Sequence, residues 1–355
     1  MIILYTLLIV LTTLFVAIRL VTFHPPRAGP VAVTSPEAAP TLKAGQTLKV
    51  LSWNVQFMAG KNNLFWFDLP DQSGPDARPS REDISATLNE VARVIREEKP
   101  DIIFLQEIAD GHAATDGEDQ LARLLTLLPR EYVCHTSAFY VWSAFVPRRQ
   151  VLGAVGIKLS ILSKYKISHA VRHQLAQTPA DWLTRQFSPR RAVLEAHLPV
   201  QGGADFVAFV THLDPLAKGT DILTRQLGVV QNLMRAASLA GQPWAFGGDF
   251  NLLPPDSQAF ARLNESQKRF YDSPSELSAL MPRAQSVPSF AECSGPEFAQ
   301  WLTHNPNDVG PTQLDKTIDY IFFADEIKIG AHSVRQHDTL KISDHLPVLA
   351  EIQLP

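Results

Sequence analysis

The chain has 355 residues, of which 45% are hydrophobic and 19% charged, with 26 prolines and 18 glycines. This composition is that of a globular protein with enough apolar side chains for a large core, and it argues against general disorder. The formal net charge of −4 excludes a strongly basic balance over the whole chain, although a local basic patch stays open. Two cysteines, Cys134 and Cys293, are too few for a disulfide framework or a cysteine-based zinc site, and a single bridge between them is left open.

The first 23 residues form an apolar segment in which Arg19 is the first charged side chain. About 20 apolar residues in a helix match the thickness of a bilayer core, so residues 1–23 are interpreted as a transmembrane anchor. A cleaved signal peptide is one alternative, but neither a basic region before the apolar run nor an A-x-A-like cleavage site is evident. A buried core helix is the other alternative.

Residues 24–45 are rich in Pro and Ala, which is typical of an extended, semi-rigid spacer. We expect this linker to hold a folded domain, residues 46–355, away from the membrane. Arg19 and Arg27 follow the apolar segment, and the positive-inside rule would therefore place the domain in the cytoplasm. Because a long spacer suits a domain on the far side of the membrane, we instead expect a periplasmic or extracytoplasmic location.

From Leu48 onward, short strand-like runs alternate with helical patterns, which predicts a domain of mixed α and β layers. Helices are expected at residues 80–100, with Ser80 as the N-cap, and at residues 221–241, ending on Gly241. Strands are expected at residues 47–55, 101–108, 155–163, 191–200, 205–213, 243–251, 317–323 and 346–354. Residues 255–317 are the least regular part, which predicts helices and long loops over one end of the sheets.

Polar side chains stand where four of the expected strands end: Asn54, Glu107, His212, and the pair Asp249 and Asn251. Side chains two apart on a strand point to the same face, so the acid and the amide of this pair are expected to address one ligand. Gly247 and Gly248 before them allow the backbone to come close. An acid that accepts a hydrogen bond beside an amide that donates one suits an attacking water and a phosphate oxygen.

Each of these residues has a plain structural alternative when taken alone: a strand-end turn, a surface carboxylate or a core histidine. Asp344 and His345 precede the last strand, where a turn is again the alternative. Asp319 lies within an apolar strand, and an unpaired charge there is expensive, so we expect a histidine partner for it. The joint pattern is stronger than any single residue, because every alternative would have to hold in a different segment, and it favours one shared site.

The motifs LSWNV, DIIFLQE, VTHLD, GGDFN, IDYIFF and SDHLPV occur in this order between Leu48 and Leu354. In this set the chain resembles the endonuclease/exonuclease/phosphatase superfamily, which contains the DNase I-like nucleases, inositol polyphosphate 5-phosphatases and neutral sphingomyelinases. The resemblance implies an α/β (α+β) fold, a four-layer αββα sandwich of two mixed sheets face to face with helices outside. It also places the active site at one edge of the sheets.

The resemblance further implies a metal and phosphate site. Glu107 corresponds to the main ligand of Mg²⁺, with Mn²⁺ as the alternative ion, and Asp344 joins the metal shell. Mg²⁺ prefers few carboxylates and several waters, so one strong ligand is enough. Asn54 supports the metal or binds phosphate. A basic group from the middle strands is expected to face the phosphate, and we assign Arg191 in preference to Arg190; a solvated loop arginine is the alternative.

The remaining motif residues are assigned to catalysis by the same resemblance. Asp249 orients or deprotonates the attacking water, and Asn251 holds a phosphate oxygen. His345 contacts the scissile phosphate or acts as a base, with Asp319 fixing its tautomer. His212 stabilises charge in the transition state. The implied reaction is hydrolysis by in-line attack of water on phosphorus.

The motifs indicate the reaction better than the substrate, because one fold and catalytic core serve several phosphate esters. The anchor, the mild acidity and two aromatic stretches, at residues 63–70 and 137–147, favour a phosphodiesterase acting on phospholipid or sphingomyelin head groups. The aromatic stretches are either lipid-touching loops or core strands. A DNase I-like nuclease acting on extracellular or periplasmic DNA is the alternative, and a non-catalytic tethered binding module is a third hypothesis. No protein partner is inferred.

Overall fold

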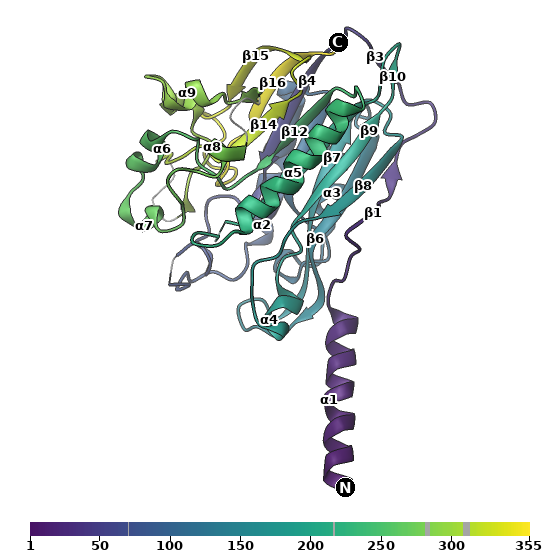
Figure 1. Ribbon diagram of the computed structural model, residues 1–355, viewed down its shortest axis with the longest axis vertical. Helices are drawn as coiled ribbons and strands as arrows, with labels where there is room; N and C mark the ends of the chain where they lie inside the picture. The colour runs from purple at the N-terminus through teal and green to yellow at the C-terminus, as the bar shows by residue number, and fades with distance from the viewer. Residues whose placement is uncertain (70, 216, 281–284, 308–312) are drawn as a thin grey trace.

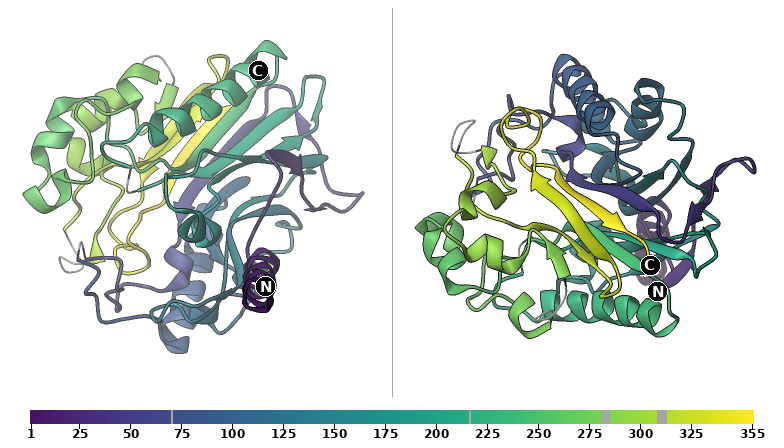
Figure 2. Two further views of the ribbon diagram at one scale, coloured as in Figure 1. Left: turned by 60° about the horizontal axis from the view of Figure 1, so that its bottom comes forward. Right: turned by 90° about the horizontal axis from the view of Figure 1, so that it is seen from above.

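The computed structural model describes residues 1–69, 71–215, 217–280, 285–307 and 313–355. Two seven-stranded sheets pack face to face. Figure 2 shows α2 (Arg81–Glu98) and α3 (Gln120–Leu127) outside one sheet and α5 (Ile222–Leu239) outside the other. The predicted α/β sandwich is confirmed.

The first sheet has the order β15-β16-β4-β5-β7-β6-β2. Its strands are β15 (Lys328–Val334), β16 (Val348–Gln353), β4 (Thr47–Asn54), β5 (Ile102–Ala109), β7 (Gly153–Ser163), β6 (Cys134–Val146) and β2 (Val33–Thr34). Successive side chains of a strand point to opposite faces. In β4, Leu48 and Val50 accordingly belong to the core between the sheets, whereas Leu51 and Trp53 pack with the apolar side chains of α2.

The second sheet has the order β1-β8-β9-β11-β12-β14-β13. Its strands are β1 (Ala28–Pro30), β8 (His169–Gln174), β9 (Ala192–Leu198), β11 (Phe206–His212), β12 (Trp244–Asp249), β14 (Asp319–Phe323) and β13 (Gln285–Val287). β11 and β12 are parallel and are joined through α5. Parallel neighbours need such a crossover, and α5 buries Leu227 and Val230 against this sheet.

The two long predicted helices form for the expected local reasons. Ser80 caps α2, since its Oγ accepts a hydrogen bond from the amide of Asp83 at 3.0 Å. Lys99, in the left-handed conformation with a φ of 53°, ends the helix just before Pro100. Ile84, Leu88 and the following apolar positions of α2 form a buried stripe at helical spacing. α5 ends at Leu239, two residues before Gly241.

α1 (Ile2–Val21) extends from the end of the domain opposite the C-terminus (Figure 1). It is long and apolar enough to cross a membrane, and none of it is buried. This agrees with an exposed apolar segment rather than with the alternative of a buried core helix.

The predicted spacer, residues 24–45, packs on the domain instead of holding it away. β1 pairs with β8 at the edge of the second sheet, and β2 pairs with β6 at the edge of the first. β3 (Leu42–Lys43) pairs with β10 (Val200–Gln201) in a separate two-stranded sheet, and Leu42 is fully buried. Proline lacks an amide donor and is tolerated at sheet edges, so a Pro/Ala-rich composition suits edge strands as well as a free spacer.

Both aromatic stretches are partly in the core. Residues 137–147 lie almost wholly in β6, whose Ala138 and Tyr140 are buried, so the core-strand alternative holds for its first part, whereas Phe145 near its end is 47% exposed. In residues 63–70, Phe65 is buried and Phe67 is 48% exposed, while residue 70 lies outside the described residues. β6, β8 and β15 were not predicted.

Residues 255–317 form short helices and loops, as expected, together with the edge strand β13, which was not expected. Positions 281–284 and 308–312 lie outside the described residues. The helices are α6 (Ser257–Arg262), α7 (Glu265–Lys268), α8 (Leu277–Leu280) and α9 (Phe290–Ser294). Cys293 in α9 and Cys134 in β6 are both buried and free, so they form no bridge.

We expect Gly248→Ala to destabilise the fold. A Cβ at this position would lie 2.2 Å from the backbone oxygen of Thr211 on the neighbouring strand, and its φ of +154° disfavours any side chain. Overpacking of this kind costs about 1–3 kcal/mol, so the melting temperature followed by circular dichroism in detergent should fall. Gly228→Ala in α5 is the matched control, because no atom lies within 4 Å of its Cβ. Equal melting temperatures for the two variants would contradict the prediction.

Candidate active site

Three strands of the second sheet bring charged side chains to one edge. β11 and β12 end at His212 and Asp249, which face each other in the parallel register. β14 runs antiparallel to β12 and begins at Asp319, opposite Asp249. The three residues therefore lie side by side because of strand register alone.

Asn54, the last residue of β4, joins this edge to the first sheet. Its Nδ2 donates to Asp249 Oδ2 at 3.1 Å and to Glu107 Oε1 at 3.2 Å. Glu107 lies in β5 with a φ of +61°, where the pairing with β7 shifts between Leu105 and Ile108. Such an irregularity re-aims a side chain, and here it turns Glu107 toward Asn54.

His212 is buried between two acids and a phenol. Its Nε2 lies 3.4 Å from Asp249 Oδ2, and its Nδ1 lies 3.6 Å from Glu107 Oε1. The hydroxyl of Tyr140 is 3.4 Å from the same Nδ1. Burial, then the charges of Arg191 and His345, lower the pKa of His212 well below its ordinary value. The ring is therefore neutral near pH 7.

His345 has the opposite protonation. Its Nδ1 lies 2.9 Å from Asp319 Oδ2, and Thr303 Oγ1 donates to the same oxygen at 2.7 Å. Burial lowers the pKa of His345, but the charges of Asp319 and Asp249 outweigh burial and raise it well above 6.5. The predicted partner of Asp319 is thus His345. With Nδ1 held, Nε2 of the imidazolium faces Asp249 at 3.5 Å.

The Asp249 and Asn251 pair is held by a turn rather than by strand alternation. β12 ends at Asp249, and Asn251 lies beyond it with a φ of +51°. Asp249 Oδ1 accepts the backbone amide of Asn251 at 3.0 Å, which is the Asx-type turn considered as the alternative. Asn251 Nδ2 donates to the carbonyl oxygen of Leu213 at 3.1 Å and has a second hydrogen left for a ligand.

Arg191 lies at this edge and is 8% exposed. Its Nε donates to Asp214 Oδ1 at 3.3 Å, and its guanidinium carbon lies 5.1 Å from the ring centre of Tyr140. Its Nη1 is buried with no hydrogen-bond partner among the described residues, which leaves a donor for an anion. Tyr140 and Thr303 were not predicted as site residues, and the aromatic run around Tyr140 is the only signal for either in the sequence.

Glu107 and Asp344 are close enough for their charges to interact, and both are candidate ligands for a divalent cation. Burial, then the charge of Asp344, raises the pKa of Glu107 to about 7. A cation between two such carboxylates would remove this unfavourable repulsion. Among the described residues, two groups bring their ligand atoms close enough together to hold an ion, and Glu107 belongs to neither. One group is His304, Asp344 and His345. The other group is Asp249, Asp319 and His345, and the His345 that both groups share is already hydrogen-bonded to Asp319 through Nδ1. All of the predicted site residues thus come together at one edge.

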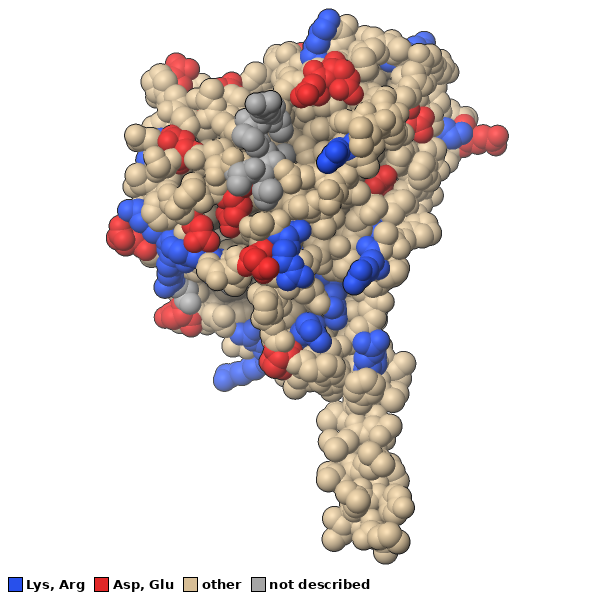
Figure 3. Space-filling model, in the orientation of Figure 1, with Lys and Arg blue, Asp and Glu red and all other residues tan. Residues whose placement is uncertain are grey.

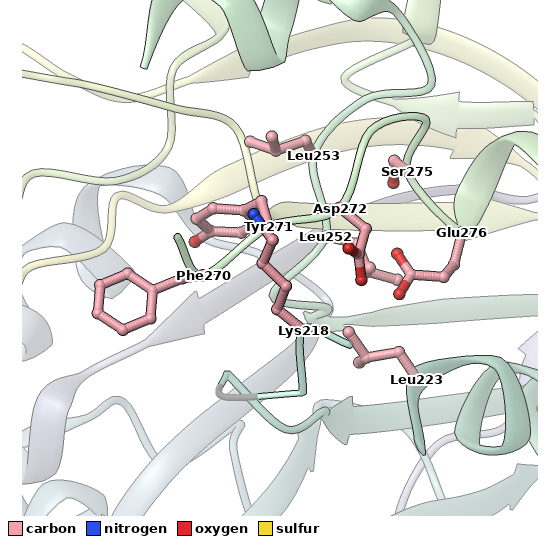
Figure 4. A pocket seen from close by; sticks show the side chains of 9 residues that line it. All are labelled: Lys218, Leu223, Leu252, Leu253, Phe270, Tyr271, Asp272, Ser275 and Glu276. Carbon is pink, nitrogen blue, oxygen red and sulfur yellow. The ribbon is translucent and has the colours of Figure 1, made fainter. Parts of the chain in front are cut away.

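A narrow pocket begins directly after Asn251 (Figure 4). Leu252, Leu253 and Tyr271 form its apolar wall, and Lys218 and Glu276 stand at its polar side. None of the strand-end residues above lines it. Much of its wall comes from residues 255–317, so the irregular segment borders the site without supplying the predicted catalytic groups.

The sequence matches the model of the Endonuclease/Exonuclease/phosphatase family over residues 51–345, and the protein therefore belongs to this family. Its members are phosphoesterases and nucleases, typically dependent on a divalent metal. No curated protein matches the sequence significantly.

Solved structures show the same fold. An endonuclease/exonuclease/phosphatase from Beutenbergia cavernae is 22% identical with a TM-score of 0.56, covering 87% of this chain and 72% of its own. ANGEL2, a 2′,3′-cyclic phosphatase, is 17% identical with a TM-score of 0.54, covering 87% and 96%. TDP2 from Caenorhabditis elegans is 16% identical with a TM-score of 0.51, covering 87% and 75%.

We expect Mg²⁺ to stabilise the protein more at about pH 8 than at about pH 5. The folded pKa of Glu107, about 7, and that of Asp249, about 6, exceed the ordinary values of 4.5 and 3.8. The folded state then binds more protons than the unfolded state, so metal-free stability falls as pH rises through this window. A cation favours the ionised carboxylates and offsets the loss. Melting temperatures with Mg²⁺ and with chelator measure the effect.

Glu107→Gln is the matched control for this measurement. It keeps the side-chain size but removes the charge, so the effect of Mg²⁺ on the melting temperature should disappear. An equal Mg²⁺ effect in both proteins would show that the cation binds elsewhere.

Proposed function

We propose that the protein is a membrane-anchored, Mg²⁺-dependent phosphodiesterase that hydrolyses its substrate by direct attack of water on phosphorus. The observation that carries the proposal is the arrangement around Asp249. This buried acid faces the Nε2 atoms of one neutral histidine, His212, and one protonated histidine, His345. An acceptor for a water proton thus stands next to a cationic donor for a phosphate oxygen.

Asp249 is suited to orient and deprotonate the water. Burial raises its pKa to about 6, against the opposing charge of His345, so that it is ionised yet basic near neutral pH. Asn54 and the amide of Asn251 hold its two oxygens in place. A base fixed in this way needs no rearrangement when the water approaches.

The donors around Asp249 are suited to bind the phosphate. The imidazolium of His345, the free Nη1 of Arg191 and the second hydrogen of Asn251 Nδ2 are available to its oxygens. Glu107, with Asp344 and Asn54, would hold the cation, which supplies positive charge to the phosphate oxygens. His212 would stabilise the charge that develops during attack. Mn²⁺ is the alternative ion.

A head group of a phospholipid or sphingomyelin is the substrate class we favour, because the site is close to the end of α1. Tyr140 contacts His212 in the site, and Ser143, three residues further along β6, donates to the carbonyl oxygen of Val21 at 2.8 Å. Three residues of a strand span about 10 Å. With α1 in a bilayer as a single-pass anchor, the site would lie close to the head groups.

The extracytoplasmic side was expected because a long free spacer suits a domain on the far side of the membrane. Residues 24–45 pack on the domain, so this argument no longer supports that side.

A nuclease is the second candidate. The ANGEL2 structure contains adenosine-2′,3′-vanadate, so a chain of this fold accommodates a nucleotide. Arg191 and the neighbouring Arg190 would suit a phosphate of either substrate class.

We expect metal-dependent hydrolysis of bis-(p-nitrophenyl) phosphate that falls by roughly 10²–10⁴-fold in Asp249→Ala and in His345→Ala. Sphingomyelin/phosphatidylcholine vesicles and duplex DNA, assayed in parallel, decide the substrate class. Asp325→Ala, an exposed acid beyond the far end of β14, is the control and should keep full activity. No turnover of any ester would reject the enzyme proposal and leave the tethered binding module.

We expect Asp319→Asn to shift the basic limb of the pH–activity profile to lower pH. The charge of Asp319 raises the pKa of His345, and activity should fall as pH rises through this pKa because the imidazolium is lost. The amide keeps the contact but not the charge, so the pKa drops. An unchanged basic limb with reduced kcat would mean that His345 does not act as a protonated donor.

A further inference from the structure

The junction between α1 and the domain is tightly packed. Thr22 forms a bridge with Ser143 of β6, whose hydroxyl also binds the carbonyl oxygen of Val21. Phe23 lies 6.5 Å from Trp142, measured between ring centres, and under the guanidinium of Arg172. The orientation of the domain relative to α1 is therefore set by these contacts, not by a flexible tether.

A short helix, α4 (Trp182–Phe187), lies beside α1 (Figure 1). The ring of Trp182 stacks on Phe15 of α1 at 5.4 Å with an interplanar angle of 17°. Phe15 is six residues before Val21, which corresponds to about 9 Å along the helix axis. If α1 spans a bilayer with Val21 at its boundary, Trp182 lies at or below that boundary. Tryptophan is enriched at this depth.

Several exposed apolar side chains lie in α4 and in the β6–β7 hairpin. Trp182 is 41% exposed and Leu183 is 49% exposed. At the tip of the β6–β7 hairpin, Phe145 near the end of β6 is 47% exposed and Leu152 in the turn is 57% exposed. Apolar side chains of this size in contact with water are unfavourable, and a bilayer interface would cover them.

Arginines surround these apolar side chains. Figure 3 shows Lys and Arg side chains on the part of the domain next to α1. Arg148, Arg149 and Arg185 are exposed. Burial, then the charges of Arg185 and Arg19, lowers the pKa of Arg190, so these arginines repel one another. Anionic lipid head groups would relieve this repulsion.

We propose that α4 and the β6–β7 turn form a bilayer-docking surface that inserts Trp182, Leu183, Phe145 and Leu152 at the interface of an anionic membrane. This inference rests on the proposed membrane anchor. It adds that the domain lies on the bilayer, with its arginines at the phosphates, and holds the site at the level of the head groups.

The test measures the depth of single nitroxide labels on the full chain in vesicles of phosphatidylcholine with phosphatidylglycerol. The labelled variants are Leu183→Cys in the surface, Leu8→Cys in α1 and Leu239→Cys as the water-exposed control. Leu239 is 78% exposed at the end of α5, and that end of the helix lies far from α1 (Figure 1). Both native cysteines are buried, so unmodified protein reports any background labelling.

We expect the label at position 183 to collide several-fold less with a water-soluble nickel complex, and more with oxygen, than the label at position 239. Replacing Arg148 and Arg149 by Glu should reduce this protection without changing the label at position 8. Lipid contact at position 8 together with water contact at position 183 would overturn the docking surface alone. Water contact at position 8 would overturn the anchor and the docking surface together.

Discussion

The side-chain amide of Asn54 links the two sheets at the edge that carries the candidate site. Its Nδ2 binds an acid from each sheet, Glu107 and Asp249, while its Oδ1 accepts the amide of Gln56 and its carbonyl oxygen accepts the hydroxyl of Ser343. These partners come from different segments of the chain, and Asn54 brings them together at the candidate site. The proposed metal ligand and the proposed base are therefore fixed relative to each other by one side chain.

Burial of like charges gives the site its chemistry. Acids brought out of water at a sheet edge have raised pKa values, which makes Asp249 basic near neutral pH and makes Glu107 receptive to a cation. The charges of Asp319 and Asp249 keep His345 protonated, while burial keeps His212 neutral. The two histidines thus take opposite protonation states, because the charges of Asp319 and Asp249 outweigh burial at His345, whereas burial dominates at His212, with the charge of Arg191 added.

The place of the site within the fold links the proposed chemistry to the proposed membrane. β6 supplies Tyr140 to the site and Ser143 to the end of α1, so one rigid strand sets the distance between them. Two arginines lie between α1 and the site. The charge of Arg190 is repelled by that of Arg19, and the guanidinium of Arg191 lies over the ring of Tyr140. A phosphate ester in a bilayer would meet positive charge before it reaches Asp249.

Local patterns in the sequence predicted the mixed α and β layers and the two long helices, because periods of 2 and 3.6 and the N-cap Ser80 are local signals. The strand-end motifs indicated one shared site, and their resemblance to a known family implied the sandwich and the role of each site residue. Tertiary structure alone decided the packing of residues 24–45, the turn at Asn251, the left-handed Glu107, and the contributions of Tyr140, Thr303 and Trp182. These depend on contacts between residues that are separated in the chain. Thr303 contacts Asp319, and Trp182 of α4 stacks on Phe15 of α1, although most strands of the first sheet lie between them in the sequence. No local pattern encodes such contacts. A Pro/Ala-rich segment fits an edge strand as well as a free spacer, and an acid after a strand fits a turn as well as a strand end.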